Sequence, residues 1–397
     1  MAKIVLYREL LRAKARRWMV LALCLASVLP SWLRSQPFSG VDDIEHGLDI
    51  VRPGAATASR LDLRDALAAL SIPSVSVALI DGGKLAWTHA WGAASEQTLY
   101  QAASLSKLVT AVAALRLVDL QRLNLDRNVN EDLVGWRVPD NALTAGQSVT
   151  LRGLLSMTAG IGVPGYVGYQ PGLPLPTLQQ ILDGAPPAHS QPVRVDNIPG
   201  TRFGYSGGGY EIVQALIESK LFGSFDRAMH EIVFSRAGMS SSIFAQPLPL
   251  ALIGRAARGH YADGRELAGG WRIVPELAAG GLWSTPTDLA KLLIEIVRAY
   301  RGEPGQIISH AAAVDMLTRQ NNGPYGLGGA IAGSGQSLVL MKRGQNVGYQ
   351  GYMLIFPITG QGIVVLSDSD NGTALATAII RRAATVYRWP PLGELAD

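Results

Sequence analysis

The chain is poor in the residues that hold metal ions and build disulfides. Its 397 residues include one cysteine, Cys24, and six histidines. A single cysteine cannot close a disulfide within the chain, and a thiolate metal site needs more than one. The histidines are scattered, without a His-Glu-x-x-His or comparable spacing. The sequence therefore gives little support to a metal mechanism, and we expect no cofactor.

Charged residues are also few, at 17% of the chain. The formal net charge of +4 is set by residues 1–36, where seven basic residues and one glutamate contribute +6 and leave −2 for the rest. A body without a basic excess does not predict a nucleic-acid partner. Hydrophobic residues make up 48%, which indicates a globular chain with a sizeable core.

The apolar run near the N-terminus is short. Residues 18–29 form a run of 12 apolar-type residues behind a basic stretch. This length suits the core of a signal peptide, whereas a spanning helix needs about 20 residues. Residues 30–34 offer no small-x-small cleavage site, so an uncleaved anchor stays open. We expect residues 1–36 to be a signal peptide or a membrane anchor, and the protein to be periplasmic, secreted or anchored in the inner membrane.

The chain is organised around Ser104 and Lys107. Residues three apart lie on one face of a helix, so these two side chains can meet. Residues 108–115 carry no charge, which predicts a helix that is buried on all sides. Both the helix N-terminus and the loss of water disfavour the ammonium form of a lysine placed there. A neutral amine activates a serine nucleophile, although a capping serine followed by a solvent-exposed lysine would have the same spacing.

Strand-like runs lie at both ends of the chain. Residues 75–80 and 85–91 predict a hairpin around the turn at 81–84. Towards the other end, glycine turns separate β-rich runs at 338–341, 352–356 and 362–366. Between these ends the patterns are helical, including a predicted helix over 212–221. We therefore predict an α+β fold, in which an antiparallel sheet built from both chain ends is flanked by helices and carries a mostly helical inserted domain.

The same patterns set the predicted boundaries. One domain is expected over residues 37–390, with a tail at 391–397. Within it, the sheet-containing part covers about 60–124 and 281–390, and the helical insert covers about 125–280.

Two further stretches complete a family pattern. Tyr205 lies in a glycine-rich stretch, and Lys342-Arg343-Gly344 stands at the predicted end of a strand, before a glycine turn. In the order S-x-x-K, Tyr205 and Lys342, the chain resembles the serine hydrolases of the class C β-lactamase and D,D-peptidase type, including the family VIII esterases. Those proteins carry S-x-x-K, then Y-x-N, then K-T-G or H-x-G. The likeness covers about residues 60–390.

The resemblance implies a role for each motif. Ser104 would attack an acyl carbonyl, and Lys107 and Tyr205 would relay its proton. Lys342 would hold Tyr205 toward phenolate and attract an anionic group of the substrate. The backbone N–H groups of Ser104 and Gln345 would form the oxyanion hole.

Two departures from the family pattern bear on the substrate. Gly207 stands where Y-x-N has asparagine, and Arg343 replaces the threonine of K-T-G. Gly207, Arg343, Gly344 and Gln345 are expected to contact the substrate. Both departures weaken the case for a β-lactam or a cell-wall peptide, so we expect a small acyl ester or amide. A β-lactamase or D,D-peptidase stays an alternative, and the sequence does not set the oligomeric state.

Two other interpretations stay open at this point. Residues 204–208 match G-x-S-x-G, the nucleophile elbow of α/β-hydrolases, but that elbow follows a buried strand and residues 193–203 contain Asp196, Asn197 and Pro199-Gly200. A catalytically inactive exported binding protein could use the same scaffold, since fold does not determine function.

Overall fold

A computed structural model describes residues 40–52, 54–221, 223–304 and 307–392. The predicted leader and most of the predicted tail lie outside these described residues. The chain divides into two units, Met1–Asp43 and Ile44–Asp397. All elements below belong to the second unit, except that helix α2 (Asp42–Glu45) spans the boundary. Within the described ranges, no helix has both the length and the apolar character needed to cross a membrane.

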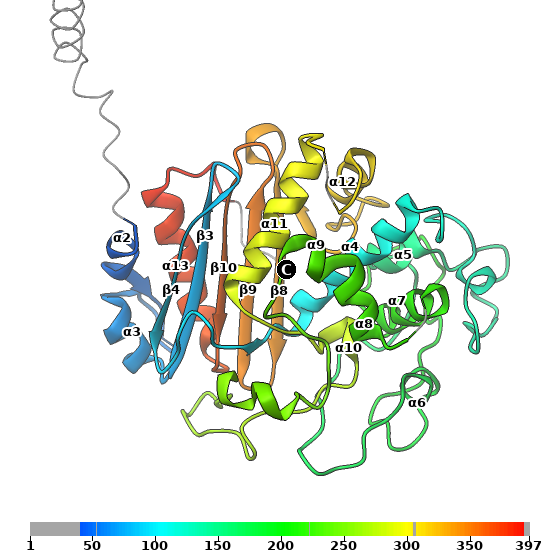
Figure 1. Cartoon of the computed structure of the whole chain (residues 1–397), viewed down its shortest axis with the longest axis horizontal. Coiled ribbons are helices and arrows are strands. Elements are labelled where there is room, and N and C mark those ends of the chain that lie inside the picture. Colours follow the sequence, from blue (N-terminus) through cyan, green and yellow to red (C-terminus); the bar gives the residue numbers. More distant parts are fainter. Residues whose placement is uncertain (1–39, 53, 222, 305–306, 393–397) are drawn as a thin grey trace, which may run out of the picture. The chain divides into compact units, whose positions relative to one another are not determined.

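A six-stranded antiparallel sheet forms the centre of the second unit (Figure 1). Its strands, in spatial order, are β4 (Lys84–Gly92), β3 (Ser74–Asp81), β10 (Gln361–Ser367), β9 (Tyr349–Phe356), β8 (Val339–Asn346) and β7 (Ala330–Ala332). Two small sheets pair β1 (Leu48–Ile50) with β2 (Ser59–Leu61), and β5 (Tyr100–Gln101) with β6 (Trp283–Ser284). Strands from both ends of the described chain thus build one sheet, which confirms the predicted fold class.

The predicted hairpin is confirmed between β3 and β4. Asp81 pairs with Lys84, and Gly82 and Gly83 both have positive φ, at 57° and 79°. A two-residue turn with two left-handed residues matches the twist of the flanking strands, and glycine adopts it without steric cost.

Helices cover both faces of the sheet. α11 (Pro286–Tyr300) packs on β3, β4, β9 and β10, while α13 (Gly372–Val386) packs on β9 and β10. Figure 1 shows these two helices on opposite faces. The remaining α-helices are α3 (Leu63–Ala69), α4 (Ser106–Asp119), α5 (Leu151–Leu155), α6 (Leu178–Asp183), α7 (Gly207–Lys220), α8 (Phe225–Met229), α9 (Ser235–Ala237), α10 (Leu277–Gly280) and α12 (His310–Met316).

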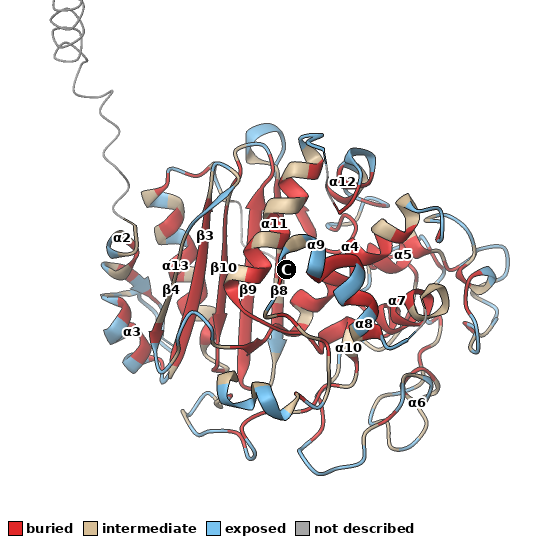
Figure 2. Cartoon of the chain, viewed as in Figure 1, coloured by how far each residue is buried: buried red, intermediate tan, exposed pale blue. Residues whose placement is uncertain are grey.

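Helix α4 is buried along almost its whole length, as the uncharged run predicts. Every residue from Ser106 to Leu115 is buried. α4 packs against α7 and α10, and the turn that precedes it packs against β8 and β9. In Figure 2 the buried residues concentrate in this helix and in the central strands.

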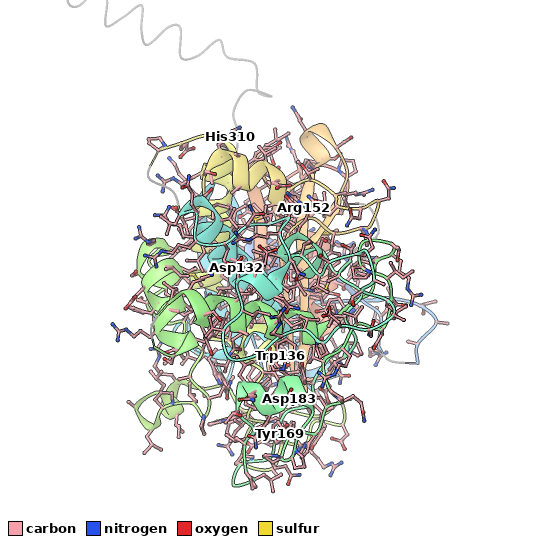
Figure 3. All side chains as sticks on the ribbon, turned by 90° about the vertical axis from the view of Figure 1, so that its right-hand side faces the viewer. Asp132, Trp136, Arg152, Tyr169, Asp183 and His310 are labelled. Atoms are coloured by element: carbon pink, nitrogen blue, oxygen red, sulfur yellow. The ribbon has the colours of Figure 1, made fainter. Side chains whose placement is uncertain are left out.

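The part between residues 125 and 280 consists of short helices joined by long loops, without a named strand among the described residues, and polar pairs connect its segments (Figure 3). Trp136 and Asp183 lie next to each other, and the indole Nε1 donates a hydrogen bond to Asp183 Oδ1 at 2.9 Å. Arg152 pairs with Asp126 and, across a long sequence separation, with Asp315. These contacts fix the connections between the short helices of this part.

Two predicted boundaries are wrong in ways that matter for the site. β8 does not end near Met341 but continues to Asn346, because residues 340–346 pair with β9 as far as Asn346–Tyr349. The second half of β8 consists of polar residues and a glycine, so a search for apolar runs does not detect that it belongs to the strand. α7 begins at Gly207, well before Ile212, because the Ser206 side chain caps its first turn.

Candidate active site

Ser104 lies in a tight turn at the entrance to α4. The turn is a 3₁₀ helix over Ala103–Leu105, and Ala103 has a left-handed backbone with φ of 49°. A non-glycine residue held in that region stores strain, which proteins retain where the surroundings impose it. β8 runs directly against this turn, since a Cβ added at Gly344 would lie 2.5 Å from Ala102 O and 3.0 Å from Ser104 N. The glycine therefore lets residues 342–344 approach Ser104.

Lys107 lies buried beneath Ser104. Its Nζ donates hydrogen bonds to Ser104 Oγ at 3.0 Å and to Ala279 O at 2.6 Å. Burial lowers the pKa of this ammonium, and although Tyr205 opposes the shift, the charge of Lys342 adds to it. The net effect makes this ammonium release its proton more readily than that of an exposed lysine, so that Lys107 can exchange a proton with its neighbours.

Tyr205 lies between two ammonium groups. Lys107 Nζ and Lys342 Nζ are 5.2 Å and 5.0 Å from the centre of its ring. Burial of the phenol raises its pKa, but the two lysine charges and hydrogen bonds from Ser104 and Lys107 outweigh this and lower the pKa to about 8. A phenol with this pKa can exchange a proton near neutral pH.

A second tyrosine, which the sequence analysis missed, holds Lys342. Lys342 Nζ donates a hydrogen bond to Tyr325 OH at 3.2 Å, and both side chains are buried. The Tyr325 ring packs edge-on to Tyr205, with ring centres 6.4 Å apart. The only signal in the sequence is an aromatic residue in the glycine-rich run 323–329.

These side chains border a cavity of about 440 Å³. Its lining comprises Ser104, Lys107, Pro164, Gly165, Tyr166, Phe203, Tyr205, Val274, Ala279, Gly280, Lys342, Arg343, Gln345 and Asn346. Three lining residues are basic and none is acidic, so the cavity suits a substrate that carries negative charge. The structure thus brings the four predicted catalytic residues together with Arg343 and Gln345. The other two predicted contact residues, Gly207 and Gly344, lie outside the lining.

At position 207 the missing side chain is replaced by a ring from elsewhere in the chain. A Cβ added at Gly207 would lie 3.0 Å from Tyr166 Cε2 and 3.3 Å from Pro164 O. The Tyr166 ring therefore occupies the place next to α7 where a residue-207 side chain would begin. Sequence reasoning identified the absent amide but not the group that fills its space.

Ser206 has a structural role, and the nucleophile-elbow interpretation is wrong. Ser206 is 4% exposed, its Oγ donates to Gly162 O at 2.7 Å and accepts from Gly209 N at 2.9 Å, and it does not line the cavity. No named strand of the described chain lies just before it. The sheet is antiparallel, unlike that of an α/β-hydrolase.

Two buried acids, also missed, lie behind the cavity wall. Glu211 on α7 accepts a hydrogen bond from Ala279 N at 3.0 Å, and the carbonyl of the same Ala279 accepts from Lys107. Burial raises the pKa of Glu211 well above its usual value, and nearby Glu276 raises it further. Burial alone raises the pKa of Glu276 to about 7. Within the described residues, no group of three His, Cys, Asp or Glu side chains could hold a metal ion.

Comparison with known proteins agrees with this architecture. A sequence model of the family described as Beta-lactamase matches residues 60–387. Penicillin-binding protein 4 of Amycolatopsis lactamdurans is 26% identical over 320 residues, which cover 77% of this chain and 79% of that protein.

Two solved structures share the fold. One is EstCE1, a hydrolase with promiscuous acyltransferase activity, with a TM-score of 0.65 and 20% identity over 82% of this chain and 96% of that one. The other is the D-amino acid amidase of Ochrobactrum anthropi SV3, with a TM-score of 0.65 and 21% identity over 83% of this chain and all of that one.

Proposed function

The chain belongs to the Beta-lactamase family, and on that premise we propose that it is a serine hydrolase that cleaves an ester or amide through a covalent acyl-enzyme on Ser104. The observation that carries this proposal is the partly buried contact of 3.0 Å between Lys107 Nζ and Ser104 Oγ, beside a tyrosine whose pKa is lowered to about 8. A nucleophile and a base within hydrogen-bond reach, with a third group beside them, are the arrangement that covalent catalysis needs.

The proposed reaction proceeds in two halves. Ser104 Oγ forms a bond to the acyl carbon while its proton passes to the pair formed by Lys107 and Tyr205. The backbone N–H groups of Ser104 and Gln345 stabilise the negative oxygen of the tetrahedral intermediate. The bond to the leaving group then breaks, and the leaving group takes the proton. A water molecule repeats these steps on the acyl-enzyme, which releases the acid and restores Ser104.

Lys342 and Arg343 are proposed to bind an anionic group of the substrate, and Lys342 also acts on the pKa of Tyr205. Both line the cavity, and Lys342 contributes to the lowered pKa of Tyr205. Because the lining holds no acid, their charge also attracts a carboxylate or another anionic group of the substrate.

For the substrate class, we propose simple acyl esters rather than cephalosporins, since residue 207 offers no amide. A β-lactamase or D,D-peptidase-type penicillin-binding protein is the second candidate, and the basic lining of the cavity favours it. A binding protein that forms the acyl-enzyme but does not release it is the third.

Export is proposed from sequence alone. Residues 1–36 carry the basic and apolar pattern of a signal peptide or anchor, so we propose a periplasmic, secreted or membrane-anchored location. Detection of the protein in the cytoplasmic fraction only would contradict this.

One substrate panel tests these alternatives. Purified protein is assayed with p-nitrophenyl esters, with nitrocefin and with a peptide ending in D-Ala-D-Ala. Ester turnover above nitrocefin and peptide turnover supports the esterase proposal. The reverse order supports the second candidate, and a stable Ser104 adduct without product supports the third.

Metal removal is the second test. The proposed steps use only side chains and backbone N–H groups of the chain, so we expect treatment with EDTA to leave the hydrolysis rate unchanged. A loss of activity that Zn²⁺ restores would contradict the proposed mechanism.

A further inference from the structure

We propose that Tyr166 determines acyl-group specificity, because it occupies the space that a side chain at position 207 would need. It is carried by residues 162–166, here called the strap, which dock on the N-terminus of α7. The inference rests on the proposed hydrolase function and extends it. The enzyme should accept acyl groups with an apolar chain next to the scissile carbonyl and disfavour those with an amide at that position.

Three hydrogen bonds hold the strap on α7. Gly207 N donates to Pro164 O at 3.1 Å, Gly208 N donates to Val163 O at 3.0 Å, and Ser206 Oγ donates to Gly162 O at 2.7 Å. The first N–H groups of a helix have no partner within the helix and carry partial positive charge. The carbonyls of Pro164 and Val163 satisfy this need at Gly207 and Gly208, and the carbonyl of Gly162 accepts from the N-cap side chain, so the strap is fixed to the helix that follows Tyr205.

One backbone angle in the strap also indicates that the surrounding contacts hold it in place. Val163 has a φ of 61°, a left-handed conformation that a β-branched residue rarely adopts. Such a conformation persists where the surrounding contacts impose it. Here its carbonyl is bound to Gly208 N, in the middle of the three hydrogen bonds.

Gly207 and Gly208 at the start of α7 allow the strap to lie directly against the helix. A Cβ added at Gly208 would lie 2.9 Å from Gly162 O and 3.2 Å from Val163 Cβ. At Gly207 the added Cβ would meet Tyr166 Cε2 at 3.0 Å. A side chain at position 207 and the Tyr166 ring therefore compete for the same space. The absence of a side chain at position 207 lets the Tyr166 ring lie this close to α7.

Tyr166 offers the cavity a ring and not a hydroxyl group. Its OH is buried and has no hydrogen-bond partner among the residues that the structure describes. Burial raises the pKa of the phenol well above its usual value, and the carboxyl groups of Glu211 and Glu276 and the phenol of Tyr169 raise it further, so the ring stays neutral. Pro164, Phe203 and Val274 extend the apolar lining around it.

This wall discriminates between acyl groups of equal length. An amide next to the scissile carbonyl would lose its water against the ring and find no hydrogen-bonding side chain at position 207, whereas an alkyl chain would bury apolar surface there. An unpaired buried polar group typically changes a rate or binding constant by about 10-fold or more.

The test compares two esters with the same leaving group and matched chain length, p-nitrophenyl pentanoate and p-nitrophenyl N-acetylglycinate. Each kcat/KM is divided by the rate of alkaline hydrolysis of that ester, which removes the difference in intrinsic reactivity. We expect the wild-type ratio to favour the pentanoate by about 10-fold or more. Fluorophosphonate labelling of Ser104 and the melting temperature are measured for every variant.

Four variants separate the ring, the hydroxyl and the competing side chain. Tyr166→Phe should keep the wild-type ratio, because the ring remains. Tyr166→Ala should reduce the preference for the pentanoate. Gly207→Asn alone should be destabilised without gaining N-acetylglycinate activity, since the ring fills its space. Tyr166→Ala/Gly207→Asn should move the ratio furthest toward the N-acetylglycinate.

Each outcome has one meaning. A ratio within twofold of wild type in Tyr166→Ala, or a Gly207→Asn variant that matches the double variant, overturns the role of Tyr166 while ester hydrolysis stands. If wild type neither labels at Ser104 nor hydrolyses either ester, the proposed function fails instead.

Discussion

Two polar clusters in this protein both combine serine with tyrosine, and they differ in the sign of the charge beside the tyrosine. The Lys107 cluster comprises Ser104, Lys107, Tyr205 and Lys342. The Asp368 cluster comprises Ser74, Ser76, Tyr100 and Asp368, and it joins β3 and β5 to the segment after β10. Each cluster places a serine hydroxyl and a phenol next to a buried ionisable group.

The charge decides what each phenol can do. In the Lys107 cluster two lysine charges outweigh the effect of burial and lower the pKa of Tyr205 to about 8. In the Asp368 cluster burial raises the pKa of Tyr100, and the Asp368 carboxylate raises it further. Tyr100 therefore stays a neutral hydrogen-bonding group, 3.0 Å from both Ser74 Oγ and Ser76 Oγ. Of the two clusters, only the one with cations beside the phenol holds a tyrosine that can exchange a proton near neutral pH.

The largest expected difference between the clusters comes from their serines. Ser104→Ala should lower ester hydrolysis by about 10⁴-fold or more and abolish fluorophosphonate labelling, since the nucleophile is gone. Ser74→Ala should keep labelling and lose about 1–3 kcal/mol of unfolding free energy, because Asp368 loses a buried partner. Label transfer to Ser206 in the Ser104→Ala protein would contradict this assignment, and thermal melts of both variants serve as the control.

The second comparison is between the tyrosines. Tyr205→Phe and Lys107→Ala should each lower kcat/KM by about 10²–10⁴-fold, the usual contribution of general acid–base catalysis. The double variant should lose little more than either single variant, because residues that act as a unit are not additive. Tyr100→Phe is the matched control, and we expect it to change stability rather than kcat/KM. Multiplicative losses would show that Tyr205 and Lys107 act separately.

A third prediction concerns pH. The pKa of Tyr205 is lowered to about 8 partly by the charge of Lys342, so kcat/KM should rise as the pH passes through this range. Lys342→Met removes a positive charge, which raises the pKa of the phenol and should move the rising limb to higher pH by about one unit. Profiles of kcat/KM between pH 5 and 10 for both proteins measure the shift. If the rising part of the kcat/KM profile lies at the same pH in both proteins, the ionisation of Tyr205 does not control the rate.

The sequence predicted those parts of the site that depend on local spacing or on an ordered motif. Ser104 and Lys107 are three residues apart in one turn, so their contact follows from helix geometry. Tyr205 and Lys342 carry no local signal of their own, and only the family pattern singled them out. The fold was predictable because β3, β4, β9 and β10 are apolar runs bounded by glycine turns.

The remaining features depend on long-range packing. Tyr166 reaches the site because its strap docks on a helix that begins at Gly207, some forty residues later in the sequence. Glu211 falls within a helical pattern, and only the packing of α7 on α10 shows that it holds Ala279. Residues 204–208 match the G-x-S-x-G motif, but the sheet is antiparallel and no named strand of the described chain leads into Ser206, so the strand-to-helix turn that the motif requires does not form there. The spacing of residues along the chain does not predict such contacts between distant segments.

Replacing Asp368 should have the smallest effect on the reaction. Its effect should appear in the free energy of unfolding instead. Asp368 is 3% exposed, and its carboxylate accepts hydrogen bonds from Ser74 N at 2.8 Å and Ser74 Oγ at 2.7 Å. Burial raises its pKa from 3.8 to about 6, although the bonds from Ser74 and the charge of His260 oppose the shift. The folded protein therefore binds this proton more tightly than the unfolded chain. The resulting stabilisation is complete below about pH 4 and is lost as the pH rises through 6, up to a total of about 3 kcal/mol.

Asp368→Asn removes this titration and keeps a side chain of nearly the same shape. The difference in unfolding free energy between wild type and Asp368→Asn should therefore change by up to about 3 kcal/mol between pH 4 and 7, with wild type relatively more stable at the acidic end. Urea unfolding at several pH values measures it, and the subtraction cancels the carboxyl groups that both proteins share. The value of kcat/KM for an ester should stay within about twofold of wild type. A stability difference that rises with pH would show that folding lowers the pKa of Asp368 instead of raising it. A large loss of activity would mean that the two clusters are coupled, and that the charge beside Tyr100 reaches the chemistry at Ser104 through β3 and β10.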